Sequence, residues 1–194
     1  MTQQRNTAAI VLAAGASQRF GTADKLQADL DNDTVLSRSL AAYRDAPLAR
    51  KIAVIRPDKN LAAICEAAGF EVHINHQADS GMGTSIATGI ATLQRETHAL
   101  IGLGDMPRLM PQTIALLSQA PINTTGIAIP TYQKARGHPR LFAAAHFQSL
   151  SALSGDMGGK RIIESCQNVM EIAVDDAAIM LDIDTQYQLG AAQL

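Results

Sequence analysis

Cysteine is scarce in this sequence, which has only Cys65 and Cys166 among its 194 residues. Neither belongs to a C-x-x-C or C-x-x-H pair, so the sequence gives no sign of a zinc site, and two cysteines cannot form a dense disulfide framework. The pattern favours two buried thiols in a reducing compartment. We therefore expect a cytoplasmic protein.

Long hydrophobic runs are missing as well. Residues 1–7 are polar, and the apolar run at 8–14 is too short for a signal peptide or a membrane span. No other segment approaches spanning length, so we expect no association with a membrane.

An excess of charge of one sign is also lacking. The formal net charge is -2, which gives no reason to expect nucleic acid or an anionic membrane as a partner. A local cluster of Lys, Arg and backbone N–H groups can still hold a small anionic ligand.

The chain does contain a regular alternation of two patterns. Short apolar runs rich in Ile and Val are typical of buried strands, and the stretches between them have helical spacing, as in Leu36, Leu40 and Tyr43. The apolar runs lie at 8–14, 51–56, 70–75, 99–103, 126–130 and 169–174. This alternation predicts one Rossmann-like α/β domain over 1–194, with a mainly parallel sheet and helices on both faces.

Residues 131–161 interrupt the alternation. A polar loop at 132–139 precedes a helix-like piece at 143–153, and a glycine-rich turn follows. An excursion of this kind late in an α/β domain usually shapes the site of a second substrate.

Ligands of such sheets bind at the carboxyl ends of the strands, where loops lead into helices. We call these loops the exits of the strands, and we expect the ligand-binding residues to lie in them. The first exit carries Gly15 and Gly21, followed by Lys25, with Arg19 between the glycines. Glycines let backbone N–H groups approach phosphate oxygens, and the two cations suit a triphosphate. The run is neither a Walker A loop nor a G-x-G-x-x-G fingerprint, and a phosphate-binding loop is favoured over a plain turn.

The second exit opens a helix that carries Ile86 and Ile90. Ser80 is expected to cap this helix, and the N–H groups at 81–85 are available for an anion or a nucleobase edge. An ordinary capped helix start explains the same pattern.

Acidic residues mark two further exits. Asp105 follows a buried strand and is placed to hold Mg²⁺, although a turn-forming role is equally consistent. Alternation sends Asp182 and Asp184 to one side of an extended segment, where either is a candidate second ligand. Thr185 is alternatively a simple cap of the last helix.

Together these motifs resemble the molybdopterin nucleotidyltransferases, which belong to the glycosyltransferase-A-like NTP transferases. The resemblance covers nearly the whole chain. Its motifs are Leu-Ala-Ala-Gly at 12–15 with Arg19, Gly21 and Lys25, then Gly-Met-x-x-Ser at 81–85, Gly-Asp-Met-Pro at 104–107, Gly-His-Pro at 137–139 and Asp-Ile-Asp-Thr at 182–185. The chain departs from the family at Gln186 and Tyr187, which replace the usual Pro-Glu.

The resemblance implies a role for each matching residue. Arg19, Lys25 and Asp105 would be catalytic, with Asp105 and Asp184 or Asp182 as ligands of Mg²⁺. The nucleotide would contact Leu12, Ala13, Ala14, Gly15, Lys25, Gly81 and Ser85. The acceptor would contact His138 of the Gly-His-Pro motif. Lys160 and Arg161 lie outside these motifs, but they follow paired glycines and are candidates to bind the acceptor phosphate. A solvated loop position for His138, and a solvated helix face for the two cations, explain the same pattern.

Ala14 carries the expectation about the base. Guanylyltransferases of the family are associated with glycine at this position, and the alanine version resembles the molybdenum cofactor cytidylyltransferases. The expected substrates are then CTP and molybdopterin, and an apo-molybdoenzyme of the xanthine dehydrogenase type is the expected partner. The alternatives are guanylyl transfer, transfer to a sugar or alditol phosphate, and a non-catalytic maturation factor. A nucleotide-dependent oxidoreductase is disfavoured by the missing G-x-G-x-x-G fingerprint.

Overall fold

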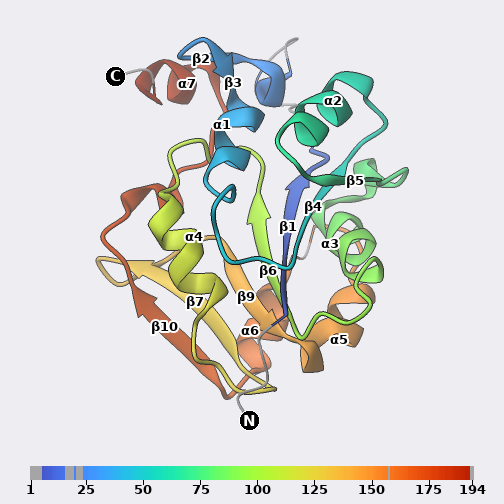
Figure 1. Cartoon of the computed structure of the whole chain (residues 1–194), viewed down its shortest axis with the longest axis vertical. Helices are drawn as coiled ribbons and strands as arrows, with labels where there is room; N and C mark the ends of the chain where they lie inside the picture. Colours follow the sequence, from blue (N-terminus) through green and yellow to red (C-terminus); the bar gives the residue numbers. More distant parts are fainter. Residues whose placement is uncertain (1–5, 16–19, 21–23, 157, 193–194) are drawn as a thin grey trace.

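The computed structural model describes residues 6–15, 20, 24–156 and 158–192. Its centre is an eight-stranded sheet with the order β10-β7-β9-β6-β1-β4-β5, and β8 pairs with β7 (Figure 1). The strands of this sheet are β1 (Thr7–Ala13), β4 (Arg50–Ile55), β5 (Glu71–Ile74), β6 (His98–Leu103), β7 (Ile127–Tyr132), β8 (Ala135–Arg136), β9 (Arg140–Ala143) and β10 (Val169–Ala173). All the apolar runs named above form strands, as predicted.

Helices cover both faces of the sheet, which confirms the predicted layers. The longer helices are α1 (Val35–Ala41), α2 (Lys59–Ala67), α3 (Met82–Ala91), α4 (Pro111–Ser118), α5 (Phe147–Ser151), α6 (Lys160–Ser165) and α7 (Gln186–Ala192). The 3-10 turns are η1 (Lys25–Gln27), η2 (Ala78–Ser80), η3 (Ala144–His146) and η4 (Ala177–Met180), and β2 (Asp29–Leu30) pairs with β3 (Asp33–Thr34).

Strand β1 divides the core into two. Every residue of β1 is buried, and successive side chains point to opposite faces. Val11 packs in a cluster with apolar residues of α1, α2 and α4, whereas Ile10 packs with those of α3, α5 and α6. Because both faces are covered, the strand reads as a continuous apolar run rather than an alternating one.

The prediction for 131–161 is partly wrong. The sequence indicated a loop and then a helix, but β8 and β9 lie there, and β9 is inserted antiparallel between β6 and β7. Leu141 and Phe142 of β9 enter opposite core clusters. A strand of four residues directly after Pro139 is too short for its period to stand out from a loop. The helix-like piece is η3 followed by the short α5.

The expectation for the cysteines holds for one of the two. Cys65 is buried in α2, and burial raises the pKa of its thiol to about 12. Cys166 is only half-buried, just beyond α6. Both are free thiols.

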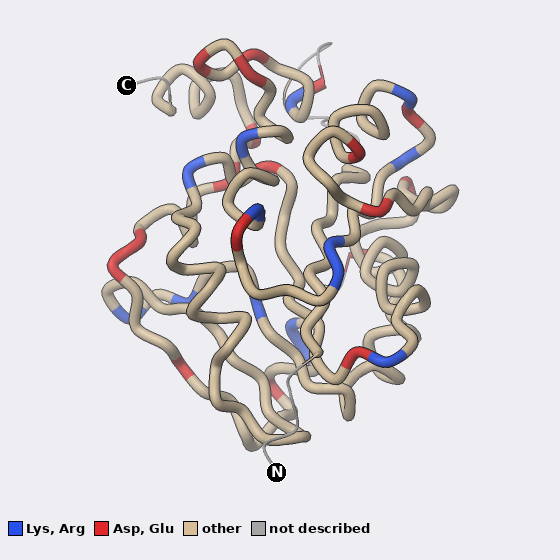
Figure 2. The backbone as a smooth tube through the Cα atoms, viewed as in Figure 1, with Lys and Arg blue, Asp and Glu red and all other residues tan. Residues whose placement is uncertain are grey.

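The two signs of charge are interspersed along the described part of the chain, with no long block of either (Figure 2). Within the same part of the chain, none of the helices has the length and apolar character needed to cross a membrane.

Candidate active site

Parallel pairing brings together the exit after β1 and the exit after β6, which carries Asp105. β1 lies between β4 and β6, with Leu12 opposite Leu103, so both strands end at the same edge of the sheet. The N–H of Gly104 donates to the carbonyl of Leu12 at 2.9 Å. A Cβ on Gly104 would lie 3.0 Å from the Cβ of Ala13, so glycine permits this close approach. Asp105 therefore leaves its strand directly beside the first exit.

The C-terminal segment adds two more carboxylates. The N–H of Ile183 donates to the carbonyl of Asp105 at 2.9 Å, and the side chain of Ile183 is buried. Its neighbours Asp182 and Asp184 consequently flank Asp105, and one oxygen from each of the three carboxylates lies within 4.8 Å of the others. The expectation that Asp182 and Asp184 share one side is confirmed.

Thr185 caps the last helix as well. Its hydroxyl accepts from the N–H of Gln188 at 3.2 Å, and the side chain of Gln188 accepts from the N–H of Thr185 at 2.9 Å. This reciprocal arrangement is a capping box, which fixes the direction in which α7 leaves the acidic segment.

Lys25 contacts two residues of the acidic cluster. It begins η1, whose N-cap Asp24 accepts from the N–H of Leu26 at 3.1 Å. The ammonium of Lys25 lies 2.6 Å from Oδ2 of Asp105 and 2.9 Å from Oδ1 of Asp184. Burial lowers the pKa of Lys25, but the attraction and hydrogen bonds of the two carboxylates outweigh it and hold the pKa above its ordinary value.

Asp105 keeps one oxygen available for another ligand. Its Oδ1 is buried and has no hydrogen-bond partner among the described residues. Burial raises the pKa of Asp105, although the charge of Lys25 acts in the opposite direction. A shielded, unsatisfied carboxylate oxygen beside two further carboxylates is a donor set that fits a hard divalent cation.

A cavity of about 550 Å³ opens beside the acidic cluster. It is lined by Leu12, Ala13, Ala14, Gly15, Lys25, Leu26, Ala78, Asp79, Gly81, Met82, Ser85, Leu103, Asp105, Asp156, Asp182 and Asp184. Every residue assigned above to the nucleotide lines this cavity, together with all three candidate metal ligands. Arg19, assigned to the same site, lies outside the described residues.

The start of α3 forms one wall of the cavity, but Ser80 does not cap the helix as expected. Ser80 ends η2, and the N-cap is Gly81, at φ 102°. A Cβ on Gly81 would lie 2.4 Å from the carbonyl carbon of Gly155, and the N–H of Gly83 donates to the carbonyl oxygen of Gly155 at 2.8 Å. The 154–156 turn therefore accepts a hydrogen bond from the start of α3 in place of a side-chain cap. The local sequence around α3 does not predict this contact, because the turn is distant in the sequence.

Sequence reasoning missed Asp79, which lines the cavity but belongs to no recognised motif. Asp156, in the glycine-rich turn of the stretch expected to shape the acceptor site, lines this cavity as well. Asn75 follows β5 directly and received no role from the sequence; its amide donates to Thr84 at 2.9 Å and to Ser85 at 3.0 Å. These two hydrogen bonds fix the position of the first turn of α3.

A second cavity of about 270 Å³ adjoins the first. Its lining is Leu12, Met82, Ile86, Ile101, Leu103, His138, Arg140, Phe142, Leu150, Asp156, Gly158, Gly159 and Lys160. The two cavities share Leu12, Met82, Leu103 and Asp156. Two of the three residues assigned to the acceptor, His138 and Lys160, line it, whereas Arg161 is exposed and lines neither cavity.

The Gly-His-Pro run places His138 in this second cavity. The N–H of His138 donates to the carbonyl of Ile179 at 2.8 Å, and a Cβ on Gly137 would lie 2.4 Å from that oxygen. Nδ1 of His138 is buried without a hydrogen-bond partner in the described part of the chain. Burial, assisted by the charge of Arg140, lowers the pKa of His138 to about 3, so the imidazole is neutral at physiological pH.

Comparisons with known proteins agree with this geometry. The model of the MobA-like NTP transferase domain matches residues 9–169. Nicotine blue oxidoreductase of Paenarthrobacter nicotinovorans is 27% identical over 191 residues, which cover 93% of each chain. The purine catabolism protein PucB of Bacillus subtilis is 28% identical over 189 residues, 91% of this chain and 90% of that protein.

Solved structures show the same likeness over the whole chain. Rv0371c of Mycobacterium tuberculosis H37Rv has 29% identity and a TM-score of 0.82, covering 98% of this chain and 99% of its own. Its manganese complex has 27% identity and a TM-score of 0.78, covering 97% and 98%. Because the family model spans most of its length, this chain belongs to the family of MobA-like NTP transferase domains.

Proposed function

We propose that this nucleotidyltransferase moves CMP from CTP to molybdopterin, giving molybdopterin cytosine dinucleotide and pyrophosphate. The observation that carries the proposal is the pair of adjoining cavities, one beside Lys25 and the acidic cluster and the other beside His138. A donor nucleotide and an acceptor need two neighbouring sites that meet near the reacting phosphates.

The proposed reaction is an in-line displacement at phosphorus. An oxygen of the acceptor phosphate forms a bond to the α-phosphorus of CTP, and the bond from that phosphorus to the bridging oxygen of pyrophosphate breaks. A phosphate monoester is largely ionised at neutral pH, so the reaction requires no general base. Catalysis then consists of positioning and of neutralising charge.

Charge neutralisation is the proposed task of the two cations of the first exit. Lys25, and Arg19 beyond the described residues, would neutralise the charge that develops on the leaving pyrophosphate. Removing one preorganised charge of this kind typically costs ~2.7–4 kcal/mol of transition-state stabilisation. Lys25 already lies at the edge of the first cavity, which supports its assignment.

Mg²⁺ is the proposed metal, and Asp105 with Asp184 or Asp182 would hold it. The ion would supply positive charge to the phosphates when bound. The available oxygen of Asp105 supports this choice of ligands, and the manganese complex of Rv0371c supports a divalent ion in the family.

Ala14 supports cytosine as the base. The residue is buried and lines the first cavity, where its methyl group takes space that glycine would leave open. The smaller pyrimidine tolerates this loss of space better than a purine. Gly81 and Ser85 line the same cavity.

The second cavity supports an acceptor with a ring and a phosphate. Phe142, Ile86 and Ile101 supply an apolar wall, and Lys160 and Arg140 supply positive charge. The neutral imidazole of His138 offers a hydrogen-bonding nitrogen to a heterocycle. Molybdopterin combines these chemical features, and an apo-molybdoenzyme of the xanthine dehydrogenase type would receive the product. The name of the Bacillus relative, a purine catabolism protein, is in keeping with that partner because xanthine is a purine.

The test is pyrophosphate release from protein incubated with Mg²⁺, molybdopterin and either CTP or GTP. We expect release with CTP that is lost in Asp105→Ala, and Ala14→Gly should extend the reaction to GTP. Release with GTP alone would replace the cytidylyl assignment by guanylyl transfer. Binding of CTP without release would favour a sugar or alditol phosphate as acceptor, or a non-catalytic maturation factor.

The Paenarthrobacter relative motivates one additional arm. Because that protein is named an oxidoreductase, oxidation of NADH and NADPH with an added redox dye as electron acceptor should be followed in the same preparation. Oxidation of either nucleotide in the absence of pyrophosphate release would contradict nucleotidyl transfer.

A further inference from the structure

Arg56 is the residue that directly follows β4, and β4 is the neighbour of β1 in the sheet. The side chain of Arg56 is 23% exposed. It lines neither of the two cavities. We propose that Arg56 is a positioning residue that holds Gly15 and Lys25 in place for the phosphates of the nucleotide. The inference rests on the proposed nucleotide site, to which it adds a residue from outside the cavity.

The guanidinium contacts two separate points of the first exit. One terminal nitrogen donates to the carbonyl oxygen of Gly15 at 3.0 Å. The other donates to Oδ2 of Asp24, and also to Oδ2 of Asp58 at 3.3 Å. A single side chain therefore joins Gly15, at the start of the first exit, to Asp24, which precedes Lys25.

Asp24 transmits this contact to Lys25. Its Oδ1 accepts from the N–H of Leu26 and so caps the turn that begins with Lys25. Gln27, at the end of the turn, donates to Asp24 at 2.8 Å and to Asp58 at 3.1 Å. The turn that carries Lys25 is thus fastened at both ends to the group of side chains around Arg56.

This group is itself anchored to α2. Asp58 is the N-cap of α2, and its Oδ1 accepts from the N–H groups of Asn60 and Leu61 at 2.9 and 3.1 Å. Asn60 also donates to Gln27 at 3.2 Å. Arg56 and the turn that carries Lys25 are therefore hydrogen-bonded to the N-terminus of α2, a packed helix, and not to surface loops alone.

An arginine suits the position for a geometric reason. Its planar fork presents several N–H groups in fixed directions, so it can bridge a carbonyl and two carboxylates at once, whereas the ammonium of lysine is a compact point charge. The ionised form of Asp24 is favoured accordingly: burial acts to raise its pKa, but hydrogen bonds from Gln27 and Arg56 outweigh this and lower it.

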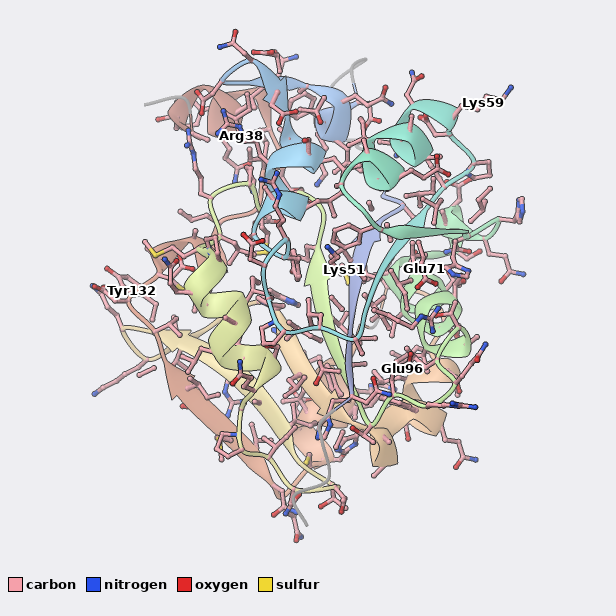
Figure 3. All side chains as sticks on the ribbon, viewed as in Figure 1. Arg38, Lys51, Lys59, Glu71, Glu96 and Tyr132 are labelled. Atoms are coloured by element: carbon pink, nitrogen blue, oxygen red, sulfur yellow. The ribbon has the colours of Figure 1, made fainter. Side chains whose placement is uncertain are left out.

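Arg50 provides a matched control at the opposite end of the same strand. It pairs with Glu71, the first residue of β5, and with Glu96, shortly before β6, both of which are labelled in Figure 3. Residues six positions apart on a strand are separated by about 20 Å. Loss of Arg50 thus removes ion pairs of comparable burial without touching Gly15 or Lys25.

The experiment measures the dissociation constants of CTP and GTP in the presence of Mn²⁺, and the midpoint of thermal unfolding, for wild type, Arg56→Gln, Arg56→Lys and Arg50→Gln. We expect Arg56→Gln to weaken nucleotide binding by about tenfold or more, and Arg56→Lys to restore only part of it. Arg50→Gln should lower the midpoint and leave nucleotide binding unchanged. Equal nucleotide affinity in wild type and folded Arg56→Gln would overturn the inference.

A double-mutant cycle keeps the inference testable should Arg56→Gln not fold. Asp24→Asn, alone and combined with Arg56→Lys, should show non-additive losses of nucleotide affinity because the two residues act through one contact. Additive losses would contradict the inference. If the wild type binds nucleotide but releases no pyrophosphate, the proposed function fails and the inference about Arg56 can still be tested. If the wild type binds neither CTP nor GTP, both the proposed function and the inference about Arg56 are contradicted.

Discussion

The ammonium of Lys25 lies 2.6 Å from Oδ2 of Asp105, although the two residues are 80 positions apart in the sequence. The same ammonium contacts Asp184 at 2.9 Å. Lys25 therefore takes the position of a counter-ion to the carboxylates that are proposed to hold a divalent metal. A metal held by these carboxylates would compete with Lys25 for them until a nucleotide provides phosphates for Lys25.

Replacing Lys25 should strengthen metal binding in the absence of nucleotide. In Lys25→Met, Asp105 and Asp184 lose the ammonium of Lys25, which then no longer competes with Mn²⁺ for them. We expect the Mn²⁺ affinity of the nucleotide-free protein to rise by about tenfold, measured by the electron paramagnetic resonance signal of free Mn²⁺. Pyrophosphate release should fall at the same time.

Lys160→Met is the control for this change, because Lys160 is exposed and lines the second cavity only. It should leave Mn²⁺ binding as in wild type. Unchanged or weaker Mn²⁺ binding by Lys25→Met would show that the ammonium and the metal do not share ligands.

Asp105→Asn should remove most of the metal affinity. The substitution keeps the shape of the side chain but replaces a charged oxygen donor with a neutral amide. We expect Mn²⁺ binding to weaken at least about tenfold, since even indirect partners of metal ligands cost 10- to 100-fold. Asp79→Asn lies in the same cavity but outside the acidic cluster, so it is the matched control. Equal Mn²⁺ affinities of the two variants would argue against Asp105 as a ligand.

Gly81→Ala should destabilise the fold at the wall of the first cavity. The residue has φ 102°, and a Cβ would lie 2.4 Å from the carbonyl carbon of Gly155. Strain and overlap together should cost at least about 2 kcal/mol in the free energy of unfolding, measured by urea denaturation.

Gly190→Ala is the comparison for this substitution. It lies inside α7, and a Cβ there meets nothing within 4 Å. It should be neutral or stabilise by up to about 1 kcal/mol. Destabilisation by Gly190→Ala as large as that by Gly81→Ala would refute the steric explanation.

His138 should make the stability depend on acidity. Its folded pKa is about 3, whereas an unfolded histidine has a pKa of about 6.5. The unfolded chain therefore binds a proton that the folded chain does not, and stability falls as the pH drops below about 6.5. Between pH 7 and pH 5 this single group should remove about 2 kcal/mol from the free energy of unfolding.

His138→Gln should lack this part of the loss, whereas His76→Gln, at an exposed position, should retain it. Urea denaturation at pH 7, 6 and 5 measures both. An identical pH dependence of wild type and His138→Gln would contradict a neutral His138 in the folded protein.

Much of the fold could be predicted because its signals are local. Residues of β1 are apolar on both faces, and this pattern appears only where helices cover both sides of a parallel sheet. Strand β9 could not be predicted in this way, because its side chains alternate between two cores over only four residues. The capping of α3 by the 154–156 turn could not be predicted either, because the local sequence offered Ser80 as a conventional N-cap.

The sequence by itself determined the alternation of strands and helices, and with it the exits at which Gly15, Gly81 and Asp105 had to lie. Only the tertiary structure decided that Lys25 meets Asp105 and Asp184, that the two cavities adjoin, and that Arg56 reaches Gly15 and Asp24 from the neighbouring strand. The physical reason is the range of each interaction. Periodicity and capping act within a few residues, whereas the contact of Lys25 with Asp184 spans 159 positions and exists only after the sheet has formed.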